Sequence, residues 1–221
     1  MFLSKFHQQD CFHHETFSQI ARAVFALIVA TGPITKAVDF YATRSNNDIY
    51  GVNIDGTMTR IGSSGPSGFF LYDIATDPVT QDDYLLGTQP ANPFAPLSGQ
   101  LYSATIGTNS VSKTLIGQIT AETFIEGGLT FNSFQGSNQL YASGAIGATA
   151  QTRTPTLYNV NPSTGVGTII NNTFTALRND MDSIFTAPDG RLWALVDLVD
   201  VSRVELFRFA TDGTVDKNII F

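Results

Sequence analysis

A short apolar segment recurs four times in this 221-residue chain, at a spacing of roughly 50 residues. The four copies lie at residues 49–52, 101–104, 157–160 and 206–209. Each copy is followed by a turn and then by a second apolar segment, at residues 59–62, 114–117, 167–170 and 217–220. Asp-Gly and related pairs occupy the turns, and such pairs favour hairpins because glycine tolerates the positive φ that tight turns require.

A second hairpin pattern fills the intervals between these copies. Its paired segments are 70–73 with 84–87, 129–132 with 140–143, and 183–186 with 192–195. Residues 40–43 resemble the second member of such a pair. Phe, Tyr, Val, Ile and Thr dominate these positions, as a pleated and half-buried surface favours. Each unit therefore offers four short strands in a fixed order.

Four antiparallel strands per unit are typical of a β-propeller blade. The complete units cover residues 68–119, 127–171 and 180–220, and a partial unit covers 38–62. We therefore predict an all-β chain, folded as a β-propeller of about four four-stranded blades. It is either a small ring or a fragment of a larger propeller. A β-sandwich and a β-solenoid are the alternatives, but the fixed strand order argues against the first and the long repeat against the second.

The first 37 residues allow two interpretations. Residues 23–31 form the most apolar run of the chain, which is too short to span a bilayer, since a helix needs about 20 residues to do so. With small residues at Thr35 and Ala37, the run fits a secretory signal peptide over residues 1–37. Alternatively, residues 1–37 are an N-terminal extension that provides the first inner strand, because residues 30–36 resemble residues 75–81.

Each interpretation implies a location. Cleavage leaves residues 38–221 as a repeat domain that is secreted, periplasmic or held in the cell envelope, without a transmembrane anchor in the mature chain. A retained leader implies a cytoplasmic protein. The second interpretation extends the first propeller unit into residues 1–37, whereas the first does not.

Composition removes several kinds of chemistry. The formal net charge of −7 argues against a nucleic-acid partner, because such binding depends on Lys and Arg facing phosphates. No His and no Cys follows residue 37. The repeat domain therefore lacks the imidazole that a Ser-His-Asp or Cys-His arrangement requires, and it lacks the usual ligands of transition metals. We expect no metal site and no cofactor, with calcium, which takes oxygen ligands, as a weak alternative.

Carboxylate chemistry remains open. The neighbouring pair Asp82 and Asp83 lies where a hairpin turn is expected, which predicts a solvated turn. Glu122 and Glu126 fall in a connection between units, where exposed charge is expected. A third group consists of Arg178, Asp180 and Asp182. These residues lie where the chain enters an inner strand, so they can face the mouth of the channel and form a ligand site.

Two long connections are candidate contact loops. Residues 88–100 and 145–156 both join the second strand of a unit to the third, so we expect them on the same face of the ring. Loops presented by a rigid scaffold often carry binding residues. Phe94 and Arg153 are the candidate ligand contacts on these loops.

The motifs at residues 128–142 and 157–168 follow the pattern G-[LF]-x-[FY], N-x-L-Y-A and L-Y-x-V-N-P-x-T-G-x-G-T. The chain thus resembles bacterial secreted and cell-envelope repeat proteins of unknown function that are expected to form β-propellers. The resemblance covers residues 38–221. It implies a propeller fold and an envelope location, and it carries no catalytic motif that could be transferred to this chain.

We therefore predict a secreted or envelope-associated β-propeller that acts as a binding or structural module without catalytic activity. A carbohydrate or a protein is the expected ligand. One alternative is a carbohydrate-active enzyme, a glycoside hydrolase or lyase that uses paired carboxylates on a propeller scaffold. Another alternative is a truncated, non-functional copy of a larger propeller.

Overall fold

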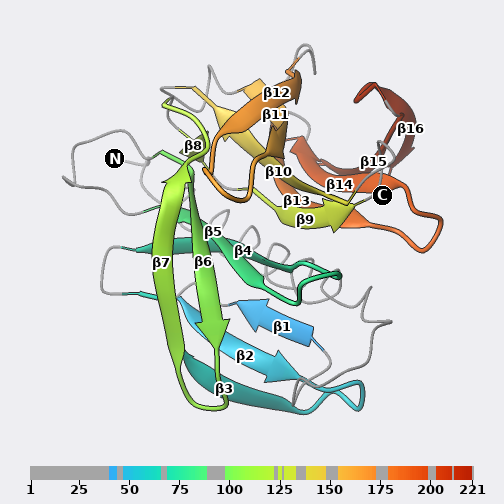
Figure 1. The fold of residues 1–221 in the computed structure, drawn as a ribbon. Helices are drawn as coiled ribbons and strands as arrows, with labels where there is room; N and C mark the ends of the chain where they lie inside the picture. Colours follow the sequence, from blue (N-terminus) through green and yellow to red (C-terminus); the bar gives the residue numbers. More distant parts are fainter. Residues whose placement is uncertain are drawn as a thin grey trace, which may run out of the picture.

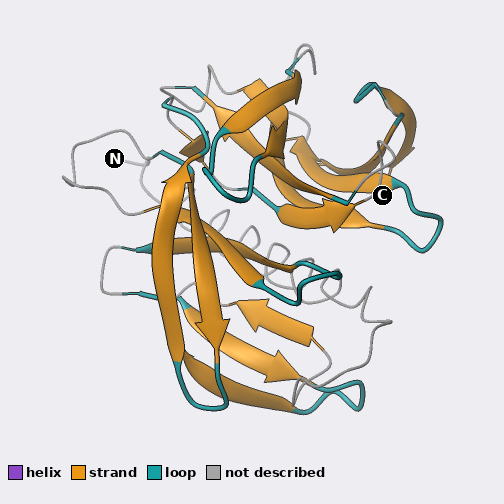
Figure 2. Ribbon diagram, viewed as in Figure 1, coloured by secondary structure: helices purple, strands orange, loops and turns teal. Residues whose placement is uncertain are grey.

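A computed structural model describes the chain over residues 40–43, 47–65, 69–88, 98–121, 124–125, 127–132, 138–147, 154–172, 179–198, 203–210 and 212–220. Within these residues every regular element is a β-strand, and Figure 2 shows strands joined by loops. No helix in the described part is long and apolar enough to cross a membrane. The first inner strand that one interpretation places within residues 1–37 lies outside the described residues.

The strands form four antiparallel sheets, which we call blades 1 to 4. Blade 1 contains β1 (Phe40–Thr43), β2 (Asp48–Val52) and β3 (Met58–Ser63). Blade 2 contains β4 (Phe70–Thr76), β5 (Asp83–Thr88), β6 (Gln100–Ile106) and β7 (Val111–Gln118). Blade 3 contains β8 (Phe124–Ile125), β9 (Leu129–Asn132), β10 (Gln139–Ile146), β11 (Thr154–Val160) and β12 (Gly167–Asn171). Blade 4 contains β13 (Asn179–Thr186), β14 (Leu192–Leu198), β15 (Arg203–Phe209) and β16 (Val215–Ile220).

The four blades make a four-bladed β-propeller (Figure 1). Strand β4 lies beside both β1 and β9, and β9 lies beside β13, so these strands gather at the centre. The outermost strands β3, β7, β12 and β16 lie at the periphery. Three apolar clusters fill the spaces between blades 1 and 2, blades 2 and 3, and blades 3 and 4. The predicted fold class is therefore confirmed.

All fifteen predicted strand segments fall within observed strands. The unpredicted element is β8, which lies in the connection that we expected to be a loop and pairs with the far end of β10. The connection over residues 145–156 is shorter than predicted, because β10 continues to Ile146 and pairs there with Thr154 of β11. We did not predict this extension because a proline, here Pro155, is unusual inside a strand. It lies in the part of β11 that precedes the pairing with β12, so its missing N–H interrupts no ladder on that side.

The Asp-Gly turns form as predicted. At the turn between β15 and β16, Gly213 has φ +82°, and the Asp212 carboxylate accepts hydrogen bonds from the N–H and hydroxyl of Thr214 at 2.9 and 2.6 Å. Asp55 and Thr57 make the same pair of bonds between β2 and β3, at 2.9 and 2.7 Å. These bonds lower the pKa of both Asp carboxyls. The carboxylates therefore belong to the structure of the turns.

An interruption recurs at the same place in the inner strand of three blades. The register of β4 shifts between Leu71 and Asp73, and that of β13 shifts between Met181 and Ser183. In blade 3, β8 and β9 both pair with β10 and are separated by residues 126–128, which include Gly127 and Gly128. Such bulges bend a strand and redirect its side chains. Each inner strand therefore turns at one level of the propeller.

Polar side chains connect neighbouring blades at this level. Asn47 of blade 1 accepts a hydrogen bond from the N–H of Leu71 at 3.0 Å and donates one to the carbonyl of Phe69. Asp73 of blade 2 accepts one from the N–H of Leu129 at 2.8 Å. Ser143 of blade 3 donates to the carbonyl of Met181 at 3.3 Å. These bonds satisfy backbone groups that the bulges remove from the ladders.

Further hydrogen bonds from polar side chains hold the junction between blades 3 and 4. Asn132 of blade 3 donates to the hydroxyl of Thr186 in blade 4 at 2.7 Å. Near the periphery, Asn171 donates to the carbonyl of Gly213 at 2.8 Å. Blades 3 and 4 are thus joined at the centre and close to the outer strands.

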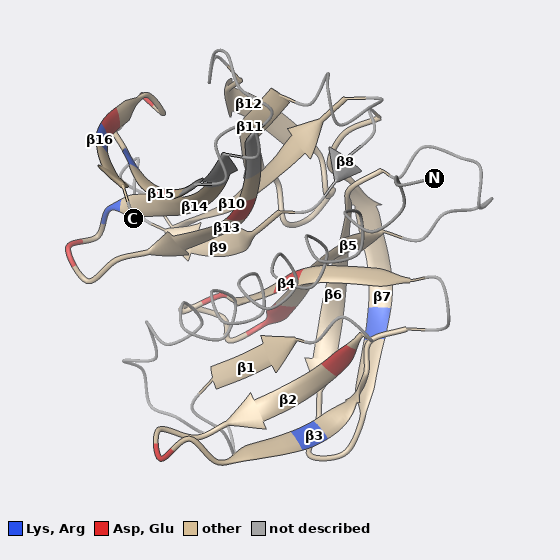
Figure 3. Ribbon diagram, turned by 180° about the vertical axis from the view of Figure 1, so that it is seen from behind, with Lys and Arg blue, Asp and Glu red and all other residues tan. Residues whose placement is uncertain are grey.

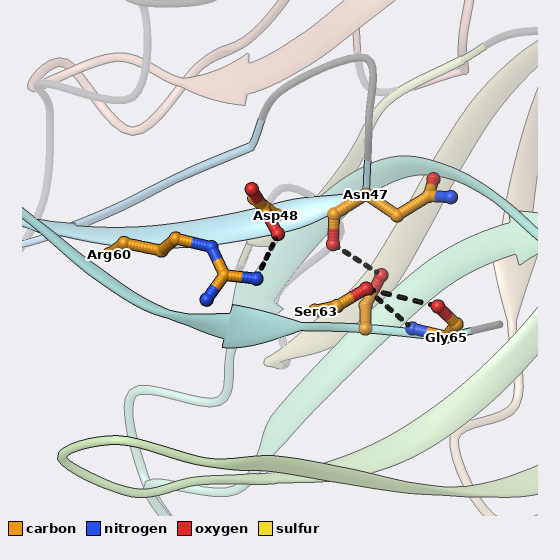
Figure 4. Close-up of polar contacts among 6 residues, drawn as sticks. Asn47, Asp48, Arg60, Ser63 and Gly65 are labelled. Atoms are coloured by element: carbon orange, nitrogen blue, oxygen red, sulfur yellow. Dashed lines mark hydrogen bonds and ion pairs between the residues drawn. The ribbon is translucent and has the colours of Figure 1, made fainter. Parts of the chain in front are cut away.

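Blade 1 has its own polar network, shown in Figure 4. Arg60 of β3 donates to the nearly buried carboxylate of Asp48 in β2 at 2.7 Å. The carbonyl of Asn47 accepts a hydrogen bond from the hydroxyl of Ser64 at 3.1 Å, and the Ser63 hydroxyl bonds the backbone of Gly65. The network fixes the end of β3 next to Asn47, the residue that bonds blade 2.

Replacing Gly127 tests the inner-strand interruption. In Gly127→Ala the new Cβ lies 1.9 Å from the carbonyl oxygen of Ser143, and the φ of +149° disfavours a side chain. We expect the free energy of unfolding to fall by about 2 kcal/mol or more. Gly62→Ala is the control, because its Cβ meets nothing closer than 3.4 Å. Urea denaturation measures both, and equal stability of the two variants would contradict the proposed role of the interruption.

Candidate functional site

The predicted ligand group at the channel is only partly described. Asp182 occupies the bulge of β13, between Met181 and Ser183, and its side chain is half-buried. Asp180 lies in the same strand, opposite Asp197 of β14 in the register, and the description extends to its backbone only. Arg178, Phe94 and Arg153 lie outside the described residues. Asp182 is therefore the one member of the predicted set whose surroundings the structure describes.

The carboxylates of the described residues take part in structural contacts. Asp83 begins β5, is nearly buried and accepts a hydrogen bond from the Thr76 hydroxyl at 2.6 Å, so it differs from the solvated turn residue we predicted. Asp82 is exposed and accepts a bond from the Thr80 hydroxyl at 2.7 Å. Asp182 also takes part in an interaction.

The other described carboxylates show the same behaviour. Asp77 accepts hydrogen bonds from the N–H of Val79 and from the side chain of Asn138 in blade 3, at 2.7 and 3.0 Å. Asp216 pairs with Arg208 across β15 and β16 at 2.7 Å, which lowers the pKa of the aspartate and raises that of the arginine. Glu205 accepts a bond from Asn218 at 3.2 Å. These groups hold turns and strands together.

A groove of about 390 Å³ lies between the outer part of blade 2 and the β11–β12 turn of blade 3. Tyr84, Ser103 and Thr114 stand side by side on β5, β6 and β7, and Thr105 pairs with Ser112 next to them. Residues paired across strands share one face of a sheet. The four hydroxyl-bearing Ser and Thr residues are exposed. We call this feature the hydroxyl groove.

Six further residues line the hydroxyl groove, and three of them, Asp83, Ala104 and Lys113, belong to β5, β6 and β7. Asp82 lines the end next to the β4–β5 turn, Ile116 of β7 lines the interior, and Pro162 of blade 3 lines the opposite wall. The ring of Tyr84 packs on Phe131 of blade 3 at a centroid distance of 5.5 Å. Burial, followed by the charges of Asp82 and Asp77, raises the pKa of the Tyr84 phenol, which therefore stays protonated at neutral pH.

The wall of the groove is held rigidly against blade 2. The N–H of Gly167 donates to the carbonyl of Ile119 at 3.0 Å, joining blade 3 to the end of β7. Gly117 and Gly165 meet backbone to backbone, and a Cβ on Gly117 would lie 2.0 Å from the carbonyl oxygen of Thr164. Within the turn, the amides of Thr164 and Gly165 donate to the carbonyl of Asn161. The groove is therefore preformed, and no rearrangement is needed before a ligand enters.

The opposite face of the same strands carries a buried cation. Asp83, Ala104 and Lys113 share that face, which packs against blade 1. The Nζ of Lys113 lies 2.8 Å from the ring centroid of Phe69 and 4.7 Å from that of Tyr102. It is buried and has no hydrogen-bond acceptor among the described residues. Burial lowers the pKa of Lys113 to about 8.

The basic stretch drawn on β7 in Figure 3 is Lys113, the one Lys or Arg in that strand. Lys113 also lines the hydroxyl groove, but its Nζ lies over the rings of Phe69 and Tyr102. Sequence reasoning missed the groove, because isolated Ser and Thr on outer strands look like ordinary exposed positions. Residues 111–118 (VSKTLIGQ) show no strict alternation of polar and apolar residues that would have marked one face of the strand.

The described residues show no group of three or more His, Cys, Asp or Glu that could hold a metal ion. Of the charged residues that line the groove, Asp82 is exposed, whereas Asp83 is nearly buried and the Nζ of Lys113 is buried. The arrangement can therefore form hydrogen bonds with a polar ligand and bury part of it. The chemistry it offers is recognition through hydroxyls, one carboxylate and one phenol.

No protein family matches the sequence, and no curated protein sequence matches it either. Among solved structures, Aspergillus kawachii β-fructofuranosidase complexed with glycerol is similar with a TM-score of 0.54 and 10% identity, over 82% of this chain and 41% of that chain. The periplasmic gluconolactonase of Pseudomonas aeruginosa gives 0.42 and 15%, over 73% of this chain and 46% of that one.

Cobalt-substituted Synechocystis apocarotenoid oxygenase gives a TM-score of 0.38 and 17% identity, over 79% of this chain and 41% of that one. The chain spans less than half the length of each of these three proteins. The likeness to the fructofuranosidase concerns the fold, in agreement with the propeller architecture. The envelope repeat family suggested by the sequence motifs is not among these matches.

Lys113 predicts an unusual pH dependence of stability. Between pH 8 and 10 the unfolded chain keeps the lysine proton, with a pKa of 10.5, while the folded chain releases it. The free energy of unfolding should therefore rise with pH in this window. Above pH 10 the opposite trend begins, because burial and then Asp83 raise the pKa of Tyr41 to about 12.

We expect Lys113→Met to remove the rise between pH 8 and 10 and to stabilise the protein at pH 7. Lys217→Met is the control, because Lys217 is exposed on β16. Urea titrations at several pH values measure both effects. A rise that persists in Lys113→Met would show that another group is responsible.

Proposed function

We propose that this β-propeller is a non-catalytic binding module and that the hydroxyl groove is its ligand site. The observation that carries this proposal is the use of the described carboxylates. Asp55, Asp73, Asp77 and Asp212 bind backbone amides of turns or of the next blade. General acid–base chemistry on a glycosidic bond requires two carboxyl groups that can face a substrate. Carboxylates that already accept these structural hydrogen bonds do not supply such a pair.

The groove supports binding in a second way. Its volume of about 390 Å³ lies in the range of small-molecule sites, roughly 300–1,000 Å³. Its wall is fixed by the Gly167–Ile119 hydrogen bond and by the contact of Gly117 with Gly165. A preformed site loses little conformational entropy when a ligand enters.

A carbohydrate-active enzyme is the second candidate. Asp182 lies at a bulge of the inner strand β13, and bulges occur often beside active sites. Asp180 lies in the same strand. The fold likeness to a β-fructofuranosidase shows that a related scaffold serves an enzyme that acts on sugars. On this alternative, substrate would enter at the channel end that carries Asp182.

One comparison separates the two candidates. A glycan panel is screened for binding and for product release with the natural chain and with Asp180→Asn/Asp182→Asn. We expect binding without turnover, and an affinity changed less than about twofold in the double variant. Asp189→Asn is the matched control, because Asn can replace Asp in the turn bond to the N–H of Arg191. Turnover by the natural chain that is lost in the double variant would sink the binding-module proposal.

We also propose that the protein is secreted or associated with the envelope, on the basis of the apolar run at residues 23–31. Intact-mass analysis of the protein expressed in a bacterial host is the test. We expect a mature chain that begins at Val38. A mass that includes residues 1–37 would contradict processing and favour the interpretation of that segment as part of the first blade.

A further inference from the structure

We infer that the hydroxyl groove recognises a neutral polyhydroxylated ligand, of the size of a mono- or disaccharide. This inference rests on the proposed binding function and specifies the ligand class of the same site. The first observation is the lining: the exposed residues Ser103, Thr105, Ser112 and Thr114 all carry hydroxyls, and that of Ser103 donates a long hydrogen bond of 3.5 Å to the Thr114 carbonyl. A hydroxyl both donates and accepts hydrogen bonds, so a row of hydroxyls matches a ligand whose groups do the same.

The arrangement of the row supports this match. Ser103 and Thr114 are paired in the β6–β7 register, as are Thr105 and Ser112, so the four side chains form two adjacent pairs on one rigid sheet face. Paired Cβ atoms in an antiparallel sheet lie about 4.5–5.5 Å apart. Neighbouring hydroxyls of a sugar ring can therefore meet two lining groups at once.

Asp82 adds an acceptor at one end of the groove. A carboxylate has two oxygens and can accept two hydrogen bonds together, as a vicinal diol would offer. The Asp82 side chain is already held by the Thr80 hydroxyl at 2.7 Å. The protonated Tyr84 phenol supplies a donor nearby.

The same charges exclude other ligand classes. Lys113 lines the groove, but its Nζ is buried over the rings of Phe69 and Tyr102, so its ammonium is not offered to an anion there. Asp82 and the net charge of −7 would repel phosphates and carboxylates. Apolar contacts come from Ile116 and Pro162, and they suit the C–H face of a sugar ring without being extensive enough for a lipid.

The test uses the full chain labelled with ¹⁵N and three hexose probes that differ in charge. D-glucose with its disaccharides maltose and cellobiose is the neutral arm, D-glucuronate the anionic arm and D-glucosamine the cationic arm. Each is titrated to about 100 mM, well above a millimolar Kd. We expect a neutral sugar to shift the amide signals of Ser103, Thr105, Ser112 and Thr114, and glucuronate to bind more weakly.

Variants then separate the groove from the rest of the molecule. In Ser103→Ala/Thr114→Val two hydroxyls are lost while strand-forming residues remain, and we expect about tenfold weaker binding. Thr59→Val, an exposed threonine on β3, is the matched control and should bind normally. Circular dichroism confirms that each variant is folded.

The outcomes are distinguishable from those that test the proposed function. No shift in the groove with any neutral sugar would overturn the ligand class, although the binding module could still take another ligand. Preferential binding of glucosamine would show that Asp82 alone selects a cation, which also overturns it. Shifts confined to the neighbourhood of Asp182 would move the site to the channel, and hydrolysis of a disaccharide would instead reject the binding-module function.

Discussion

The junction between neighbouring blades is the constraint on which the rest of the structure depends. A single blade has two faces and cannot bury both by itself, so the fold exists only when one sheet packs on the next. Apolar clusters provide most of the driving force at the three described junctions. Apolar contacts have no preferred direction, so the clusters alone do not align one sheet on the next. Asn47, Asp73 and Ser143 give them a register, because each bonds a backbone group of the adjacent inner strand at the bulge level.

This arrangement explains how the sparse charge of the chain is used. Only 14% of the residues are charged, and the described carboxylates stabilise turns, neighbouring blades or an outer strand. Asp83 shows the consequence. Although Asp83 follows the exposed Asp82, it begins β5 and is nearly buried. Its carboxylate accepts a hydrogen bond from Thr76 of the paired strand β4.

The strand pattern was predictable because it repeats. Fifteen segments with alternating apolar residues and Asp-Gly turns reinforced one another, so the fold class did not depend on any single segment. The two differences arose where local chemistry opposed the pattern. Gly127 and Gly128 hid the short strand β8, and Pro155 hid the start of β11. The candidate site was less predictable. The hydroxyl groove needs Pro162 of one blade next to Ser103 of another, and no local pattern in the sequence reports that proximity.

The Asp-Gly-Thr turns have a consequence for behaviour in acid. The hydrogen bonds from Thr57 and Thr214 lower the pKa of Asp55 and Asp212, so these turns contribute stability above the ordinary Asp pKa of 3.8 and lose it as the pH falls further. Arg208 lowers the pKa of Asp216 on the last strand, so this ion pair also contributes stability above the ordinary Asp pKa and loses it in acid. All three carboxyls lie on the periphery, whereas the inner-strand bulges are held largely by amides and hydroxyls. Acidification should therefore fray the propeller from its rim inward, and the central strands should separate last.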